Sequence, residues 1–300
     1  MKVLLIGGAG FIGKNIQYIY KGDILVVDDL SSGTKNLETN NLSIVQDYSI
    51  TLDSIKKWRE NKNIIIVFLA GETRVSEAMS RPLDFVKANI SKPSIFLNEV
   101  LKEGDRVILA STCGAMFDGT LNISQNTIPK PLNFYGYSKL AQEQVLTGIC
   151  KLHKCDLIIT RFTNVFGILS EHKKSAIHAF IKASFKGRTV KINGAGEQTR
   201  DFIFAQDVAH GIIKLFDKEN KSETGVEIFA RGQSHSVNEI YKFINSITPL
   251  QKKHIASTEL LSTEPDHVIV EKNAISQFFS NSVSFFDALE QTYKYYSENN

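Results

Sequence analysis

A glycine-rich loop near the N-terminus constrains the fold of this chain more than any other feature. The apolar run Lys2–Ile6 leads directly into Gly7–Gly13, which reads GGAGFIG, and a helical pattern follows. Read from Gly8 the loop is GxGxxG, and read from Gly7 it is GxxGxxG. Glycines so placed let the chain turn tightly and bring its backbone close to a pyrophosphate at a helix N-terminus. The loop therefore predicts a strand–turn–helix unit that binds a dinucleotide.

An acidic residue at a suitable distance makes this prediction more specific. The apolar run Ile24–Val27 ends at Asp28, which lies 20 residues beyond Gly8. A carboxylate at this place accepts hydrogen bonds from the adenosine ribose hydroxyls and repels a 2′-phosphate. The combination predicts NAD rather than NADP as the cofactor.

Strand-like and helix-like segments alternate along the first half of the chain. Strands are expected at Lys2–Ile6, Ile24–Val27, Ile64–Leu69, Arg106–Ala110 and Leu157–Arg161. Helical spacing covers Gly13–Tyr20, Leu83–Leu101 and Ser138–Leu152. This alternation is typical of an α/β fold, here a Rossmann-like doubly wound parallel sheet with helices on both faces.

The rhythm changes after about residue 165, where glycines separate shorter elements. We expect residues 1–165 to form an NAD-binding Rossmann domain and residues 166–300 to form mostly a small C-terminal substrate-binding lobe. Segments at about 200–232 are expected to return to the Rossmann domain. The end of the chain has a helical pattern around Phe278–Tyr296.

Composition and charge exclude several classes of protein. Hydrophobic residues make up 42% of the 300 residues, which is enough for an ordinary core, and the net charge of +3 is too small and scattered to indicate nucleic acid binding. Cys113, Cys150 and Cys155 have no CxxC spacing, so we expect free thiols in a reducing compartment and no metal site. The longest apolar run, Ile64–Ala70, is too short to span a membrane. We therefore expect a cytoplasmic protein.

A tyrosine and a lysine, Tyr135 and Lys139, stand four residues apart and would share one face of a helix. A free tyrosine, with a pKa near ~10, is a poor base at neutral pH. A nearby ammonium and the positive nicotinamide ring favour the phenolate and lower this pKa. The pair follows Val107–Gly114, an expected strand that ends in hydroxyls at the carboxyl edge of the sheet, where such folds bind ligands. This position predicts a catalytic site.

Together these residues resemble the extended short-chain dehydrogenase/reductases, and within them the NAD-dependent epimerase/dehydratase family that includes the UDP-glucose 4-epimerases. Two further segments carry the resemblance: Arg161–Gly167 is similar to RxxNVYG, and Gly194–Phe202 is similar to GxGxQxRDF. The resemblance covers most of the chain. It implies NAD as cofactor, a nucleotide-sugar substrate and a homodimer.

The resemblance also implies roles for single residues. Tyr135 would take the proton from O4 of the sugar, Lys139 would hold the nicotinamide ribose, and Thr112 would hydrogen-bond O4. The implied substrate-binding residues are Thr112, Cys113, Asn164 and Arg200, of which Arg200 would grip the diphosphate. The implied cofactor-binding residues are Gly7, Gly10, Phe11, Ile12, Gly13, Asp28, Asp29, Leu30, Ser31, Ser32, Gly33, Asp47, Tyr48, Leu69, Ala70, Gly71, Asn89, Tyr135 and Lys139.

The sequence leaves open which of several neighbouring residues supplies the catalytic hydroxyl. Counting back from Phe117 gives Cys113 or Thr112, and Thr112 is preferred because it keeps a hydroxyl, with Ser111 as the fallback. Cys113 is expected to be a buried packing thiol. In addition, Gly114-Ala115 stands where the sugar 4,6-dehydratases carry an Asp-Glu pair, which disfavours dehydration.

The function implied by the resemblance is NAD-dependent 4-epimerisation of a nucleotide sugar through a transient 4-keto intermediate. A nucleotide-sugar 4-ketoreductase stays open, because the residues named above do not separate the two. A 4,6-dehydratase and a non-catalytic cofactor-binding subunit are the remaining alternatives. The homodimer is expected to form through two helices, the one near Asn89–Leu101 and the one that carries Leu140, Val145, Leu146 and Ile149.

Overall fold

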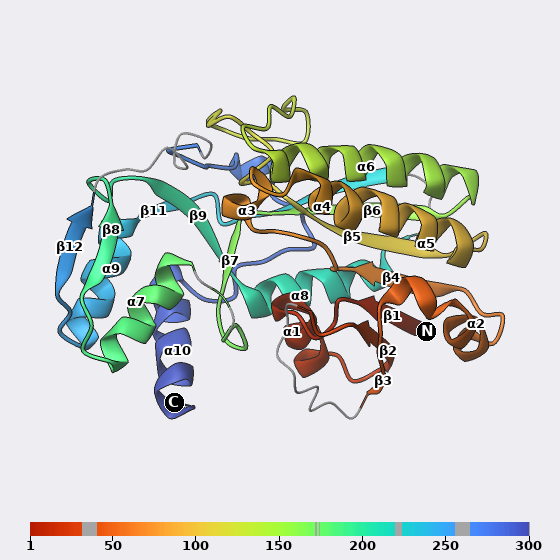
Figure 1. Ribbon diagram of the computed structural model, residues 1–300, viewed down its shortest axis with the longest axis horizontal. Coiled ribbons are helices and arrows are strands. Elements are labelled where there is room, and N and C mark those ends of the chain that lie inside the picture. Colours follow the sequence, from red (N-terminus) through yellow and green to blue (C-terminus); the bar gives the residue numbers. More distant parts are fainter. Residues whose placement is uncertain (32–40, 172, 174, 220–223, 256–264, 300) are drawn as a thin grey trace.

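The computed structural model describes residues 1–31, 41–171, 173, 175–219, 224–255 and 265–299. A seven-stranded sheet occupies the centre of its larger part (Figure 1). The strand order is β10-β6-β5-β4-β1-β2-β3, and every neighbouring pair is parallel. The α/β, Rossmann-like prediction is therefore confirmed. The strands are β1 (Lys2–Ile6), β2 (Asp23–Asp28), β3 (Leu42–Val45), β4 (Ile64–Phe68), β5 (Arg106–Thr112), β6 (Asp156–Phe162) and β10 (Thr224–Phe229).

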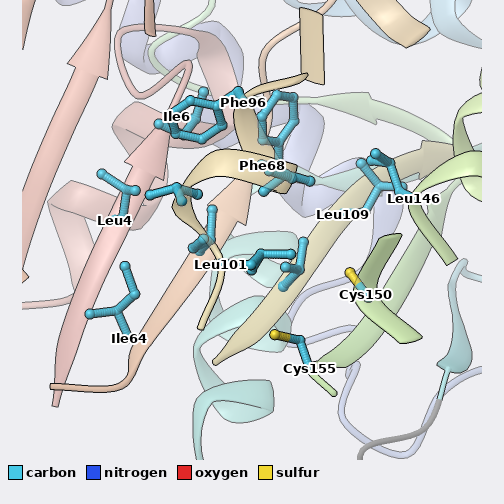
Figure 2. Close-up of a cluster of buried hydrophobic side chains, with 14 of the residues drawn as sticks. Leu4, Ile6, Ile64, Phe68, Phe96, Leu101, Leu109, Leu146, Cys150 and Cys155 are labelled. Atoms are coloured by element: carbon cyan, nitrogen blue, oxygen red, sulfur yellow. The ribbon is translucent and has the colours of Figure 1, made fainter. Parts of the chain in front are cut away.

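Helices cover both faces of this sheet because alternate residues of its buried strands point to opposite sides. Leu4 and Ile6 of β1 pack into one hydrophobic cluster, and Val3 and Leu5 pack into another. Figure 2 shows the first cluster, which also holds the buried thiols of Cys150 and Cys155. Its covering helices are α2 (Leu52–Arg59), α5 (Lys92–Val100) and α6 (Phe134–Leu152), while α1 (Phe11–Ile19) and α8 (Ala205–Lys214) cover the second.

A smaller lobe is built from later parts of the chain around a third cluster of buried side chains (Figure 1). Its strands are β7 (Asn164–Phe166), β8 (Val190–Asn193), β9 (Thr199–Phe204), β11 (Ser234–Ser236) and β12 (Lys252–Ile255), and its helices are α7 (Ala176–Phe185), α9 (Val237–Ile247) and α10 (Phe285–Glu298). Between β9 and β11 the chain returns to the larger part, where α8 packs on α1 and β10 pairs with β6.

The continuous helix predicted over Leu83–Leu101 is wrong in its middle. The structure has α4 (Pro82–Val86), a π-helical turn η2 (Lys87–Ser91) and then α5. Pro93 has no N–H to donate to the carbonyl four residues back, and the Lys92 N–H instead bonds the Lys87 carbonyl five residues back. The turn holds Asn89, which is fully buried.

The C-terminal helix α10 begins later than its sequence pattern indicated. Its first residue is Phe285, because the Ser284 side chain accepts a hydrogen bond from the Asp287 N–H and caps the helix there. Within the described ranges, no helix is long and apolar enough to cross a membrane. The short elements are η1 (Tyr48–Ile50), α3 (Val75–Ala78), η3 (Leu215–Asp217) and η5 (Lys272–Ala274).

Candidate active site

Close backbone contacts explain the glycines of the loop after β1. Gly7 has φ +80°, and a Cβ atom there would lie 2.7 Å from the Ala70 nitrogen. A Cβ atom on Gly13 would lie 2.5 Å from the Gly8 carbonyl oxygen. Among the described residues no side chain caps α1, so the N–H groups of its first turn, beginning at Phe11, face the carboxyl edge of the sheet. This bare helix N-terminus fits the pyrophosphate of a dinucleotide.

Asp28 joins the end of β2 to the glycine loop. Its Oδ2 accepts a hydrogen bond from the Ala9 N–H at 2.8 Å, and its Oδ1 accepts one from the Leu30 N–H at 2.8 Å. Burial raises the pKa of Asp28, and the two backbone bonds partly offset this rise. The other predicted residues of this turn are Asp29 and Ser31, which are exposed, and Ser32 and Gly33, which lie outside the described residues.

Asp47 and Tyr48 follow β3 and lie in different environments. The Asp47 carboxylate forms an ion pair with Lys92 of α5, which lowers its pKa. The Tyr48 ring packs edge-on against Phe68 and Phe96 in the first hydrophobic cluster, with centroid distances of 5.4 and 5.1 Å. The Tyr48 ring therefore belongs to the hydrophobic core, and its contact with the cofactor stays a prediction.

Asn89 ties the loop after β4 to α6. Its Oδ1 accepts from the Glu72 N–H at 2.8 Å, and its Nδ2 donates to the Glu72 carbonyl and to the Ser138 hydroxyl, both at 3.0 Å. A Cβ atom on Gly71 would lie 2.6 Å from Asn89 Oδ1, so a glycine is needed there. The predicted cofactor-binding residues Leu69–Gly71 form this loop and are thereby fixed relative to α6.

Tyr135 and Thr112 are brought together at the carboxyl edge of the sheet. The Asn133 side chain caps α6 by accepting from the Gly136 N–H at 3.0 Å. A Cβ atom on Gly136 would lie only 2.0 Å from the Ala115 carbonyl oxygen, so the first turn of α6 sits directly on the segment after β5. In this arrangement the Thr112 hydroxyl oxygen accepts from the Ala115 N–H at 3.3 Å, and Thr112 lies close enough to Tyr135 to lower the pKa of its phenol.

The charge states of the tyrosine–lysine pair differ from those of the free side chains. Burial raises the pKa of Tyr135 to about 12, and the neighbouring Thr112 hydroxyl opposes this rise only in part. The Lys139 ammonium donates to the Ala110 carbonyl at 2.7 Å and to Gln142 Oε1. Burial lowers the pKa of Lys139 to about 8, although the nearby Glu143 acts to raise it. In the cofactor-free chain the phenol is therefore neutral at pH 7.

The two alternatives to Thr112 are engaged elsewhere. The Ser111 hydroxyl donates to Glu143 Oε1 at 2.6 Å, and Arg161 donates to both oxygens of the same carboxylate at 3.0 and 2.6 Å. The Cys113 thiol is fully buried, contacts the Arg161 carbonyl, and has a pKa raised by burial. The geometry thus favours Thr112 as the hydroxyl that serves a substrate.

Asn164 and Arg200 lie on the neighbouring strands β7 and β9 of the smaller lobe. Asn164 Nδ2 is 3.5 Å from the Asp201 carbonyl oxygen. A Cβ atom on Gly114 would lie 3.9 Å from the same Asn164 Nδ2. Asn164 is therefore next to the segment that follows Thr112. Arg200 donates to the Asp266 carbonyl at 3.1 Å, so its guanidinium lies beside the segment that contains Asp266.

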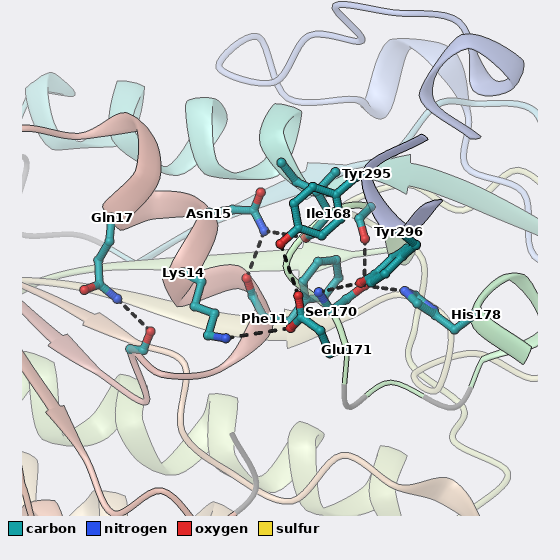
Figure 3. Close-up of polar contacts among 12 residues, drawn as sticks. Phe11, Lys14, Asn15, Gln17, Ile168, Ser170, Glu171, His178, Tyr295 and Tyr296 are labelled. Atoms are coloured by element: carbon teal, nitrogen blue, oxygen red, sulfur yellow. Dashed lines mark hydrogen bonds and ion pairs between the residues drawn. The ribbon is translucent and has the colours of Figure 1, made fainter. Parts of the chain in front are cut away.

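A polar network that the sequence did not reveal connects the glycine-loop helix to the smaller lobe (Figure 3). Lys14 of α1 is 3.8 Å from Glu171, and next to it the Ser170 hydroxyl contacts His178 of α7 and the Tyr296 hydroxyl of α10. Ser170 and Tyr296 are 126 positions apart, so no local pattern could have indicated the contact. The loop between the lobes is therefore held from three helices.

Comparisons with known proteins agree with this geometry. A model of the "NAD dependent epimerase/dehydratase family" matches residues 3–229. A curated relative, a "putative UDP-glucose 4-epimerase" of Methanocaldococcus jannaschii, is 28% identical over 250 residues, which cover 81% of each chain.

Solved structures of similar fold cover essentially the whole chain. The UDP-glucose 4-epimerase of Thermotoga maritima, solved with UDP-glucose, superposes with a TM-score of 0.87 at 23% identity and covers 100% of this chain and 99% of its own. The UDP-glucuronic acid 4-epimerase of Bacillus cereus, solved with UDP-glucuronic acid and NAD, gives a TM-score of 0.87 at 23% identity and 100% coverage of both chains. At these identities the likeness shows the fold.

Proposed function

This chain belongs to the NAD-dependent epimerase/dehydratase family, and we propose that it is an NAD-dependent nucleotide-sugar 4-epimerase. The observation that carries the proposal is the placement of Tyr135 next to the segment that follows Thr112, beside the buried ammonium of Lys139 and at the sheet edge that holds the glycine loop. The relatives named as 4-epimerases of UDP-sugars support the reaction and the class of substrate.

The residues at the carboxyl edge of the sheet fit NAD. The bare N-terminus of α1 suits the pyrophosphate, and the carboxylate of Asp28 at the end of β2 suits the adenosine ribose. Lys139 has two of its three N–H groups bound by the protein, which leaves one for the nicotinamide ribose. Bound NAD supplies the group that accepts hydride from C4 and returns it.

Tyr135 moves the proton in the proposed reaction. Its phenolate takes the proton from O4 while C4 is oxidised, and its phenol gives the proton back when the 4-keto sugar is reduced from the other face. Since burial raises the pKa of Tyr135 to about 12, formation of the phenolate depends on a positive charge that the cofactor-free chain does not place on it. Thr112 donates to O4 and stabilises the negative charge that develops there.

The smaller lobe orients the nucleotide end of the substrate. Asn164 lies next to the segment after Thr112, and Arg200 projects from the adjoining strand with a charge suited to a diphosphate. We assign residues 1–165, with α8 and β10, to cofactor binding, and most of residues 166–300 to the sugar nucleotide. The reaction then takes place between the two parts.

We also propose a homodimer formed through α5 and α6, which lie side by side on one face of the sheet (Figure 1). Apolar side chains that stay exposed on them are Ile95, Val145 and Leu152. Of the residues expected to supply this surface, Val145 is exposed, whereas Leu140, Leu146 and Ile149 pack into the hydrophobic clusters. Light scattering at micromolar concentration should give twice the chain mass of 33.6 kDa, and a value near 33.6 kDa would contradict the dimer.

We propose a cytoplasmic location because the cysteines are free thiols. Cys113, Cys150 and Cys155 are all buried free thiols, as expected in a reducing compartment. Fractionation of the source cells, with detection of the untagged protein, tests this location, and recovery from an oxidising compartment would contradict it.

The function is tested by a screen of UDP-, dTDP-, GDP- and CDP-sugars with identification of the products. Purified protein without added cofactor should convert at least one of them into its C4 epimer, because NAD is regenerated in each cycle. A product that forms only in the presence of added NADH would identify a ketoreductase instead, and loss of water would identify a dehydratase.

A further inference from the structure

The ammonium of Lys139 is buried and is held by two acceptors. Only 6% of the residue surface is exposed. One acceptor is the Ala110 carbonyl of β5 at 2.7 Å, and the other is the side-chain oxygen of Gln142, one helical turn further along α6. Because the Ala110 acceptor belongs to the backbone, Gln142 is the acceptor that a substitution can change.

The environment of Gln142 is unusual for a residue that serves packing alone. Its side chain is fully buried, and its Nε2 finds no hydrogen-bond partner among the described residues. The orientation of the amide follows from Lys139, because an ammonium can only donate and the oxygen must face it. An apolar side chain of similar size would avoid an unpaired buried donor, so the oxygen toward Lys139 is the feature that explains a glutamine here.

We propose that Gln142 is a positioning residue that holds the Lys139 ammonium against β5, so that its third N–H points to the cofactor. The inference rests on the proposed function for the identity of what that third N–H binds. The hydrogen bond from the Lys139 ammonium to Gln142 is already present in the cofactor-free chain.

The charged and titratable neighbours of Lys139 determine how Gln142 should act. Glu143 raises the pKa of Lys139, but this carboxylate is shared with Arg161 of β6 and the Ser111 hydroxyl of β5. Tyr135, on the same helix, is neutral at pH 7. The side-chain oxygen of Gln142 binds the charged form of the lysine more strongly than the neutral amine, and it therefore favours the ammonium against the effect of burial.

Two substitutions at this position should act in opposite directions. Gln142→Met keeps the size of the side chain and removes the acceptor, so the pKa of Lys139 should fall. Gln142→Glu adds a negative charge at the same distance, so the pKa should rise. Each shift should be about one pH unit, the size expected for a hydrogen bond to a charged group. A role in packing alone would not produce opposite shifts.

The primary experiment is an NMR titration of cofactor-free protein labelled with 13C in the lysine side chains, with the Lys139 signal assigned by its loss in Lys139→Met. In the unaltered protein Lys139 should titrate near pH 8. Matched controls are Gln144→Met and Gln144→Glu, two residues further on the same helix but exposed, which should leave the titration unchanged. A Lys139 titration that is the same in both Gln142 variants and the unaltered protein overturns the proposal, and Gln142→Glu alone decides the matter if Gln142→Met does not fold.

A second readout separates this inference from the proposed function. NAD affinity, measured by calorimetry across pH, should decline on the alkaline side at a pH that moves with the Lys139 titration in each variant. If the Lys139 titration shifts but the pH dependence of NAD affinity does not, Gln142 positions Lys139 as proposed. The same result would show that Lys139 does not bind NAD. Matching shifts in both measurements support both.

Discussion

Among single residues, Tyr135 gives the most direct test of the proposed reaction. Tyr135→Phe removes only the hydroxyl, so the ring contact with Phe85 and the fold should survive. NAD binding should also survive, because Lys139 and the glycine loop are unchanged. Turnover should fall by roughly 10²–10⁴-fold, the usual contribution of a positioned acid–base group. Steady-state kinetics on the substrate found in the screen measure this, and near-normal turnover would rule out Tyr135 as the base.

Thr112 and its neighbour Cys113 form a second test at the same scale. Thr112→Val keeps the shape of the side chain and removes the donor to O4, so turnover should fall on the order of 10²-fold or more. Cys113→Ser is the control, because that thiol is buried and contacts the Arg161 carbonyl. The control protein should turn over almost normally. A folded, inactive Cys113→Ser protein that still binds NAD would move the catalytic contact to residue 113.

Lys139 also predicts a pH dependence of stability. Burial lowers the pKa of Lys139 from 10.5 to about 8, so between these values the unfolded chain binds more protons than the folded one. The contribution of Lys139 to the free energy of unfolding should therefore rise as the pH increases from about 8 to 10.5. Urea unfolding of the wild type and of Lys139→Met at several pH values isolates this difference, since other groups titrate in both. A difference that stays constant over this range would mean that Lys139 is not desolvated.

Secondary elements were predictable where burial alone decides them. The strands come from apolar runs, because a parallel strand covered on both faces has no polar side. The structure places β1 at Lys2–Ile6, as predicted, and β5 at Arg106–Thr112, which extends the predicted run Arg106–Ala110 by two residues but stops short of Gly114. The π-helical turn was not predictable from periodicity, since its cause is the missing N–H of Pro93 rather than a change in pattern.

The start of α6 shows why part of the site was also missed. The helical spacing was predicted over Ser138–Leu152, whereas α6 begins at Phe134 and includes Tyr135 and Gly136 in its first turn. The glycine is needed for contact with Ala115, a residue distant in the pattern. The YxxxK spacing of Tyr135 and Lys139 could be found from the sequence, but the partners of Lys139 could not, because nothing in the spacing indicates which side chains are buried.

Gly136 therefore yields a prediction at the scale of the element. Gly136→Ala places a Cβ atom 2.0 Å from the Ala115 carbonyl oxygen, so α6 must move away from the segment after β5. We expect a loss of about 1–3 kcal/mol in the free energy of unfolding, together with a loss of turnover.

The control for Gly136→Ala lies on the same helix. Gly148 has no atom within 4 Å of its ideal Cβ position among the residues outside its own turn of helix. Gly148→Ala should therefore raise stability by about 0.5–1 kcal/mol, because alanine loses less conformational freedom in a helix than glycine. Thermal or urea unfolding compares the two variants, and equal effects would contradict the close contact at Gly136.

At the scale of the whole molecule, the chain leaves the central sheet after β6, returns to it at β10, and then completes the smaller lobe. The sequence indicated two parts and a return at about 200–232, but the contacts that join them depend on residues far apart, such as Ser170 and Tyr296. These contacts connect α1, which begins at the glycine loop, to α7 and α10 of the smaller lobe (Figure 3). The regions that we propose for cofactor and substrate are thus joined by direct contacts, as a reaction between two bound molecules would require.

The most direct test of the proposed reaction follows the hydrogen on C4. The protein, without added cofactor, is given a nucleotide sugar that was active in the screen and that carries deuterium at C4. If the enzyme is a 4-epimerase, the hydride leaves and returns within one site, so the C4 epimer should keep its deuterium at C4, as measured by mass spectrometry and NMR. Exchange of the label with solvent, or formation of product only when NADH is supplied, would contradict the account.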